Sequence, residues 1–249
     1  MPASKPPANV KAPAPTARAF TTRLMALQSD DELRKIQRYF KSGEGNYGES
    51  DRFIGARMGS IFALAREFVS LPPKELETLL ESDIHELRVG ALSIMAKQYG
   101  LKTTDEARRK QLFELYLRRH DCINNWDLVD LAAWHVVGAW LTDKPRKILY
   151  RLAKSKSLWE RRTAILATFA FIKRGELDDT FAIAEMLLTD GEDLIHKAVG
   201  GMLRAAGGKD PKALTAFLER HATTMPRTML RYAIEHYAAT ERQRWLAKQ

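Results

Sequence analysis

Cysteine and long apolar runs are both scarce in this chain of 249 residues. Its single cysteine, Cys122, cannot form an internal disulfide, and a lone thiol without a Cys/His cluster argues against a structural zinc site. No segment approaches 18 consecutive apolar residues, so we expect none to span a membrane. These absences fit a reducing compartment, and we expect a cytoplasmic protein. We also expect a monomer without a metal ion or small-molecule cofactor.

β-Branched apolar residues are also rare. Val and Ile together number 19, whereas Ala and Leu number 62, a ratio that favours helices over strands. Apolar positions such as Leu87, Ala91 and Ile94 follow a period of 3.6 residues, and Gly- and Pro-containing turns recur. No strand–turn–helix unit of a nucleotide-binding α/β fold stands out. The sequence therefore predicts an all-α protein of about a dozen helices.

Acidic residues are missing from the first 23 residues, which hold five of the ten prolines and four basic residues. Such a segment cannot bury enough apolar surface to offset its ordering entropy. We expect residues 1–23 to be a disordered basic tail and residues 24–249 to be a single domain. The unbroken apolar core of a secretory signal is absent, whereas a transit peptide stays possible.

Positive charge is abundant, with 40 Lys and Arg against 31 Asp and Glu and a net charge of +9. A balance this basic makes a polyanion the first partner to consider. Four of these charges belong to the tail, which leaves 36 basic and 31 acidic residues, or +5, in the domain. The distribution of charge is therefore more informative than its total.

A degenerate repeat places basic residues at similar positions in successive helices. Its first residues, 42, 32, 35 and 30 positions apart, are Arg88, Asp130, Arg162, Lys197 and Arg227. Spacing near 35 residues is typical of stacked helical hairpins such as HEAT-like repeats. The repeat predicts a curved solenoid whose concave face carries these five residues and binds a nucleic-acid backbone. For any one of them, an ordinary solvated position is the alternative.

The segment from Asn124 to Asp130 is the most unusual in the chain. Asn124 or Asn125 can cap a helix, and Asp127 suits its first turn. Trp126 and Asp130 then lie on one face, where an indole and a carboxylate could together attract a cation. The alternative is that Trp126 packs in the core and Asp130 pairs with a neighbouring Arg.

One repeat later, Arg162 could stand beside Asp130. It could hold that carboxylate in orientation, or grip a phosphate next to the site, and the spacing is compatible with both roles. Two other patterns are weaker evidence for a catalytic or metal-binding site. Residues in His120-Asp121-Cys122 point in different directions on a helix, and the six histidines show no metal-binding spacing.

Three spaced motifs resemble the AlkD-type DNA alkylation repair glycosylases, a family of HEAT-like repeat proteins. The first combines Trp126-Asp127-Leu128-Val129-Asp130 with the later Trp159-Glu160-Arg161-Arg162-Thr163-Ala164-Ile165. The second, Tyr47 to Arg57, is similar to the family signature YGExDxFLGVR, and the third, Ile195 to Gly200, is similar to IxKAxGW. The resemblance extends from about Tyr39 to Tyr237.

This resemblance implies hydrolysis of the N-glycosidic bond of cationic N3- and N7-alkylated purines in duplex DNA, without base flipping. It implies that Trp126, Asp130 and Arg162 form the catalytic group. The residues expected to bind DNA are Tyr47, Arg57, Arg88, Arg161, Lys197, Arg204 and Arg227. Gly201 departs from the family, several members of which have Trp there, so substrate range or rate could differ.

The chemistry of these residues is compatible with that reaction. A cationic purine leaves without a general acid, so the enzyme must chiefly stabilise the oxocarbenium-like sugar left behind. Asp130 can supply the opposing charge and orient water, while Trp126 offers a π face. The alternative function is a non-catalytic HEAT-like module that binds unusual DNA structures or a protein partner.

Overall fold

The computed structural model describes residues 15–40, 48, 49 and 51–248 of the chain. Within them the structure is helical, and only an isolated bridge between Arg52 and Ile84 has strand-like pairing. The helices are α1 (Ala17–Met25), α2 (Asp30–Tyr39), α3 (Met58–Glu67), α4 (Pro73–Leu80), α5 (His85–Gly100), α6 (Glu106–Arg118), the 3₁₀ turn η1 (His120–Cys122), α7 (Trp126–Ala132), the π-helical turn η2 (Ala133–Gly138), α8 (Lys147–Ala153), α9 (Leu158–Ala167), α10 (Phe169–Arg174), α11 (Asp178–Met186), α12 (Asp193–Gly207), α13 (Pro211–His221), α14 (Arg227–Ala233) and α15 (Ala239–Leu246). The prediction of an all-α solenoid is confirmed.

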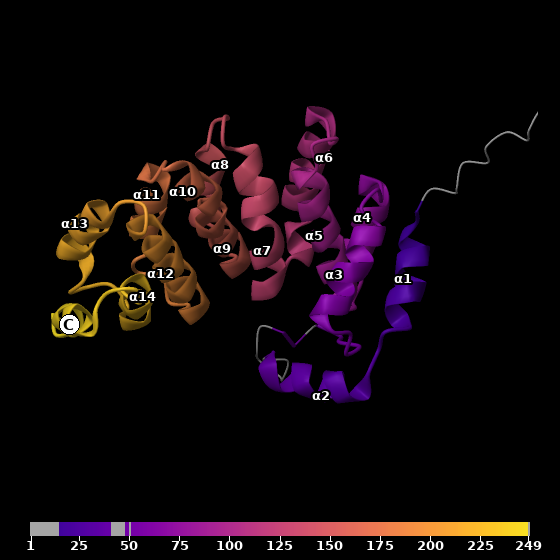
Figure 1. Ribbon diagram of the computed structural model, residues 1–249, viewed down its shortest axis with the longest axis horizontal. Coiled ribbons are helices and arrows are strands. Elements are labelled where there is room, and N and C mark those ends of the chain that lie inside the picture. The colour runs from indigo at the N-terminus through magenta and orange to yellow at the C-terminus, as the bar shows by residue number, and fades with distance from the viewer. Residues whose placement is uncertain (1–14, 41–47, 50, 249) are drawn as a thin grey trace, which may run out of the picture.

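The helices are stacked in chain order along an arch (Figure 1). One row contains α3, α5, α7, α9, α12 and α14, each packed against the next. Helices α4, α6, α8, α11 and α13 pack against this row as a second layer. Buried Leu, Ile, Val, Phe and Ala side chains join both rows into one continuous apolar core. Among the described helices, none is both long and apolar enough to cross a bilayer.

The predicted boundary at residue 23 is wrong. Residues 17–23 belong to α1, which begins after a Thr16 cap and packs against α3 and α4. Ala17, Phe20 and Leu24 form its apolar face, and the Phe20 ring lies edge-on to Phe68 with 5.2 Å between ring centroids. Composition averaged over the whole segment concealed this short amphipathic stretch. The predicted disorder of residues 1–14 concerns positions outside the described part of the chain.

Helix α2 lies apart from the stack, below the arch (Figure 1). A buried carboxylate fixes the loop that returns the chain from it, because Glu86 accepts hydrogen bonds from the backbone N–H groups of Ile54 (3.0 Å) and Gly55 (2.9 Å). Gly55 has a φ of 79°, and a Cβ atom there would overlap the backbone oxygen of Ser29, the residue that caps α2. Only glycine fits this approach, which brings the loop against the start of α2.

Two neighbouring glycines of α12 have opposite surroundings. A Cβ atom on Gly200 would lie 2.5 Å from the backbone oxygen of Met229 on α14, whereas a Cβ atom on Gly201 would have no atom within 4 Å. We expect Gly200→Ala to destabilise the fold by about 2 kcal/mol, since α14 must move away. Gly201→Ala should instead stabilise it by up to about 1 kcal/mol through helix propensity. Thermal unfolding of the two variants checks this; equal melting temperatures would contradict the close packing of α12 on α14.

Candidate functional site

Of the two asparagines that could cap helix α7, the structure uses the second. Asn125 has extended backbone angles and its side-chain oxygen accepts the N–H of Trp126 at 2.8 Å, so it is the N-cap. Asp127 then lies in the first turn. Trp126 and Asp130, four residues apart, line the same surface hollow. The predicted helix cap, the first-turn position of Asp127 and the shared face of Trp126 and Asp130 are therefore confirmed.

Arg162 on α9 forms a two-pronged ion pair with Asp130. Its Nε and Nη2 atoms lie 2.9 Å from the two carboxylate oxygens, and Nη1 donates to the backbone oxygen of Leu194 at 2.6 Å. The guanidinium is buried, whereas the Asp130 side chain is 39% exposed. These three hydrogen bonds hold the guanidinium in one orientation, and the guanidinium in turn holds the carboxylate in one orientation. Of the two roles considered for Arg162, the structure favours orientation of Asp130. The pairing of Asp130 with an arginine, expected under the alternative interpretation of this segment, is thus present.

Two opposing effects act on the pKa of Asp130. Burial raises the pKa of its carboxyl group, and the charge and hydrogen bonds of Arg162 oppose that rise, with a net upward shift. Because the guanidinium donates to both oxygens, the observed pair requires the carboxylate form. Asp130 thus presents a fixed negative charge, partly open to solvent.

Two aromatic side chains pack against the indole of Trp126. The indole is stacked on Phe40, with 5.5 Å between centroids and 17° between planes, and lies edge-on to Tyr39 at 5.7 Å. Phe40 is buried, while Tyr39 is exposed and lines the hollow. Trp126 is neither a core residue nor a free side chain: it is held by one face and lies partly open to the hollow.

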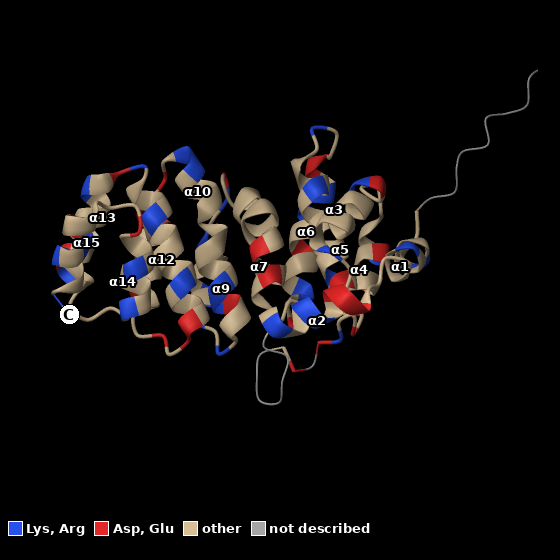
Figure 2. Cartoon of the chain, turned by 60° about the horizontal axis from the view of Figure 1, so that its bottom comes forward, with Lys and Arg blue, Asp and Glu red and all other residues tan. Residues whose placement is uncertain are grey.

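We call the cavity around this carboxylate the Asp130 hollow. It has a volume of about 840 Å³ and is lined by Tyr39, Trp126, Asp130, Leu158, Arg162, Leu166, Glu192, Asp193, Leu194, Lys197, Ala198, Gly201, Met202, Arg204 and Tyr232. Figure 2 shows the acidic positions of α7 beside basic positions of α9 and α12. Because Glu192 and Asp193 also lie on its rim, the Asp130 hollow carries both signs of charge rather than a uniformly basic surface.

Behind Trp126, a buried polar network connects α5, α7 and the loop before α3. The imidazole of His85 lies between two carboxylates, with Nε2 2.8 Å from Asp127 and Nδ1 3.1 Å from Asp51. Asp51 also accepts from the Asn125 amide at 2.9 Å and is paired with the Arg88 guanidinium. The residue that caps α7 is thus held by the same carboxylate as His85.

The charges of this network stabilise one another. Burial lowers the pKa of His85, but the hydrogen bonds and charges of Asp127 and Asp51 outweigh it and raise the pKa to about 9. Burial raises the pKa of Asp51, whereas His85, Asn125 and Arg88 together lower it to about 2. At neutral pH, His85 is therefore an imidazolium between two carboxylates.

Two of the residues predicted to bind DNA have structural partners instead. Arg88 is buried against Asp51 and does not reach the surface, so its assignment is wrong. Arg161 is paired with Asp190 at 2.6 Å and donates to the backbone oxygens of Ser155 and Lys156. These bonds anchor the start of α9 rather than leaving Arg161 free for a ligand.

The other predicted residues are spread out. Lys197 and Arg204 line the Asp130 hollow, where they pair with Asp193 and Glu235 respectively. Arg57 is exposed and paired with Glu32, outside that hollow.

The register of the repeat holds for three helices only. Asp130, Arg162 and Lys197 are each the fifth residue of their helix, whereas Arg227 is the first residue of α14 and lies outside the lining of the Asp130 hollow. The repeat therefore brings three of its five first residues to one site. Tyr47 lies outside the described residues.

Sequence reasoning missed two exposed tyrosines, Tyr39 and Tyr232, which line the Asp130 hollow from α2 and α14. The signal available for Tyr39 was the pair of adjacent aromatic residues that it forms with Phe40; none was available for Tyr232. His120 and Cys122 do not face each other, since His120 bonds to Thr163 (2.9 Å) and the sulfur of Cys122 to Arg119. Within the described part of the chain, no group of three or more His, Cys, Asp or Glu side chains could hold a metal ion.

Comparison with known proteins gives two findings. The family model described as DNA alkylation repair enzyme matches residues 20–237. A solved structure, described as a predicted DNA alkylation repair enzyme from Enterococcus faecalis, is similar in fold: its TM-score is 0.66 at 15% identity, over 85% of this chain and 97% of that chain. No curated protein sequence matches. Since the family model covers most of the chain, the protein belongs to the DNA alkylation repair enzyme family.

Proposed function

We propose that this protein is a monofunctional DNA glycosylase that hydrolyses the N-glycosidic bond of N3- and N7-alkylated purines in duplex DNA. The observation that supports this most directly is the Asp130–Arg162 pair, in which an anchored guanidinium holds both oxygens of a carboxylate that is still partly exposed. Membership of an alkylation repair family makes damaged DNA the natural partner.

The fixed carboxylate suits the charge that this reaction develops. Alkylation at N3 or N7 makes the purine a cation, so it departs as a neutral base and leaves positive charge on the sugar. Asp130, oriented in advance, stabilises that oxocarbenium-like sugar, and its open side can accept a hydrogen bond from the attacking water. The C–N bond breaks, water adds to the anomeric carbon, and the proton released passes to solvent or to the carboxylate.

Trp126 is the second residue that can stabilise positive charge on the sugar. The indole is immobilised by stacking on Phe40, so a sugar that approaches its exposed surface meets a rigid π face, which attracts developing positive charge. Trp126 and Asp130 lie in an open hollow shared by several helices rather than at the end of a deep pocket. This arrangement suits a lesion that is approached from the duplex surface without flipping the base into a pocket.

The test is release of free bases. Duplex DNA that carries N3-methyladenine and N7-methylguanine is incubated with the full chain, and the liberated bases are quantified by chromatography against a sample without protein. We expect release well above the spontaneous rate. DNA binding with release at the spontaneous rate would contradict the proposal and leave the non-catalytic module as the function.

A further inference from the structure

A second hollow lies beside α7, on the side where α3 and α5 pack. We call it the Lys97 hollow; it has a volume of about 620 Å³ and is lined by Phe62, Arg66, Val69, Ser93, Ala96, Lys97, Gly100, Leu101, Leu131 and His135. Arg66 comes from α3, Lys97 from α5 and His135 from η2. No carboxylate is among its lining residues.

Both hollows border the outward face of α7 and η2. The residues of this stretch that are buried in the core are Asp127, Leu128, Val129, Ala132, Ala133, Val136, Val137 and Gly138. Those that are not fully buried are Trp126, Asp130, Leu131, Trp134 and His135, and they recur at helical spacing along the stretch. Leu131 follows Asp130 directly, and His135 lies little more than one turn further along the helix. A ligand that covers Asp130 and extends across α7 therefore reaches the Lys97 hollow.

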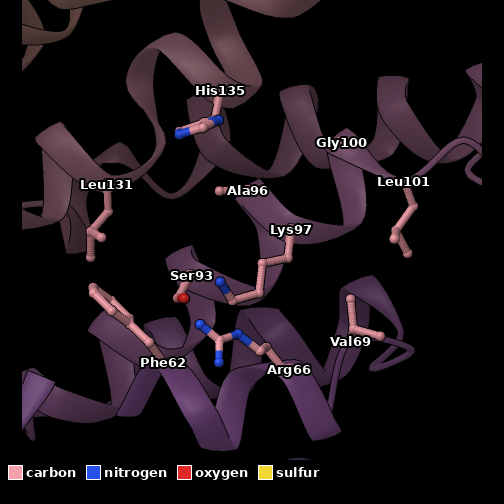
Figure 3. Close-up of a pocket in the computed structure, with 10 residues that line it drawn as sticks. All are labelled: Phe62, Arg66, Val69, Ser93, Ala96, Lys97, Gly100, Leu101, Leu131 and His135. Carbon is pink, nitrogen blue, oxygen red and sulfur yellow. The ribbon is translucent and has the colours of Figure 1, made fainter. Parts of the chain in front are cut away.

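Cations converge in this hollow without acidic partners. Figure 3 shows the Lys97 ammonium beside Ser93 and the Arg66 guanidinium just below it, both extending toward the middle of the hollow. Neither pairs with a carboxylate of the described residues, in contrast to Arg162, Lys197 and Arg204 of the Asp130 hollow. The Lys97 ammonium lies 5.7 Å from the centroid of the Phe62 ring, which leaves its N–H donors available.

Burial and nearby positive charge both lower the pKa of His135. Burial lowers the pKa of its imidazole, and the charges of Lys173 on α10 and Lys97 on α5 lower it further, to about 4. The Lys173 ammonium lies 4.6 Å from the centroid of Trp134, beside His135. Like charges gathered without compensation repel one another, and an anion bound between them removes that repulsion.

We propose that the Lys97 hollow binds a phosphate group of the DNA backbone while Asp130 faces the lesion. Arg66 and Lys97 would donate to the phosphate oxygens from α3 and α5. The neutral imidazole of His135 and the hydroxyl of Ser93 are additional polar groups at the same place. This inference rests on the proposed function only in taking DNA as the partner; it does not require that bases be excised.

The first experiment measures binding of the full chain to undamaged duplex DNA at several salt concentrations. Lys97→Gln and Arg66→Gln should each weaken binding about fivefold to tenfold and reduce the slope of log K against log salt by about 0.9. Lys110→Gln is the matched control, because Lys110 is exposed on α6 and lines neither hollow. If Lys97→Gln and Lys110→Gln bound alike, with equal slopes, the proposal would be overturned.

The second experiment locates the phosphate. Duplexes are prepared in which one phosphate at a time is replaced by a neutral methylphosphonate, and each is tested with wild type and with Lys97→Gln. One replacement should weaken wild-type binding but have little further effect on Lys97→Gln. If the two losses add at every position, Lys97 contacts no phosphate and the proposal fails.

Two further measurements distinguish a backbone anchor from a catalytic role of Lys97 and from a site for free phosphate. In single-turnover excision, Lys97→Gln should raise the protein concentration needed for the half-maximal rate by the same fivefold to tenfold as it weakens binding; a slower rate at saturation with an unchanged half-maximal concentration would place Lys97 in the reaction itself and overturn its role as an anchor. Binding of wild type with the methylphosphonate pattern but without excision would reject the proposed function and keep the phosphate site. Inorganic phosphate at constant ionic strength should compete only weakly, and full competition at low concentration would overturn the backbone anchor in favour of a site for free phosphate.

Discussion

Asp130→Asn is expected to slow excision of N7-methylguanine by about 10²- to 10³-fold, the range observed when one preorganised electrostatic contact to a transition state is removed. Affinity for intact duplex should be unchanged or higher. The reason is that the substitution removes a negative charge from the surface that we propose meets DNA, while the shape of the side chain is kept. Opposite effects on binding and on rate would identify Asp130 as a residue that acts on the transition state.

The substitution also affects Arg162. That guanidinium is buried and loses an ionic partner, although the backbone oxygen of Leu194 and the amide oxygen of the new Asn can still accept from it. We expect the melting temperature to fall by only a few degrees, consistent with a loss of about 1–2 kcal/mol. Single-turnover rates should therefore be compared at a temperature well below both transitions.

Glu192→Gln provides the matched control for Asp130→Asn. It removes one carboxylate from the rim of the same hollow, where Glu192 is exposed and makes no ion pair with Arg162. We expect its excision rate to stay within about threefold of wild type, since a solvated rim charge contributes little to a transition state. If Asp130→Asn retained the wild-type rate, or if Glu192→Gln were equally slow, Asp130 would not be the catalytic carboxylate.

The main features of the site could be predicted from the sequence because they depend on local order and on the repeat. Asn125 caps α7, which places Trp126 and Asp130 on one face. A spacing of one repeat then brings Arg162 beside Asp130. Helix periodicity is a short-range property and the repeat recurs at similar spacing, so both can be identified from the sequence. The spacing alone left the role of Arg162 open between orienting Asp130 and gripping a phosphate.

The residues that were misassigned depend on long-range partners. Arg88 occupies a repeat position that resembles that of Arg162, yet Asp51, 37 residues earlier in the chain, holds it inside the protein. His85 is one of six scattered histidines in the sequence, and only folding places it between Asp51 and Asp127. A basic residue at a repeat position is equally compatible with a surface or a buried partner, and the sequence does not distinguish them.

The free energy of unfolding is expected to fall by about 3 kcal/mol as the pH rises from about 6.5 to about 9, because of His85. His85 is almost fully buried between Asp51 and Asp127, and its pKa of about 9 exceeds that of a free histidine. A group whose pKa is raised on folding stabilises the native state below its unfolded pKa. That contribution is lost as the pH rises through the folded pKa.

Asp51, His120 and His135 affect stability at lower pH than His85 does, and their effects can be told apart from its effect. Asp51 has a lowered pKa of about 2, so its contribution is lost only as the pH falls below about 4. His120 and His135 have lowered pKa values, and they destabilise the fold as the pH falls below about 6.5. Stability should therefore be greatest near the pKa of a free histidine and decline on both sides, with His85 responsible for the alkaline decline.

Urea unfolding from pH 6 to pH 9.5 measures this decline, and His85→Gln assigns it. The variant should be less stable than wild type at pH 6.5, because Asp51 and Asp127 lose the cation between them, and the two curves should converge toward pH 9. His236→Gln is the control, since His236 is exposed and should keep the wild-type pH profile. Parallel curves for wild type and His85→Gln would show that the imidazole is not protonated on folding. Convergence would thus show that the charge of His85 stabilises the network whose Asp51 also holds the Asn125 cap of α7.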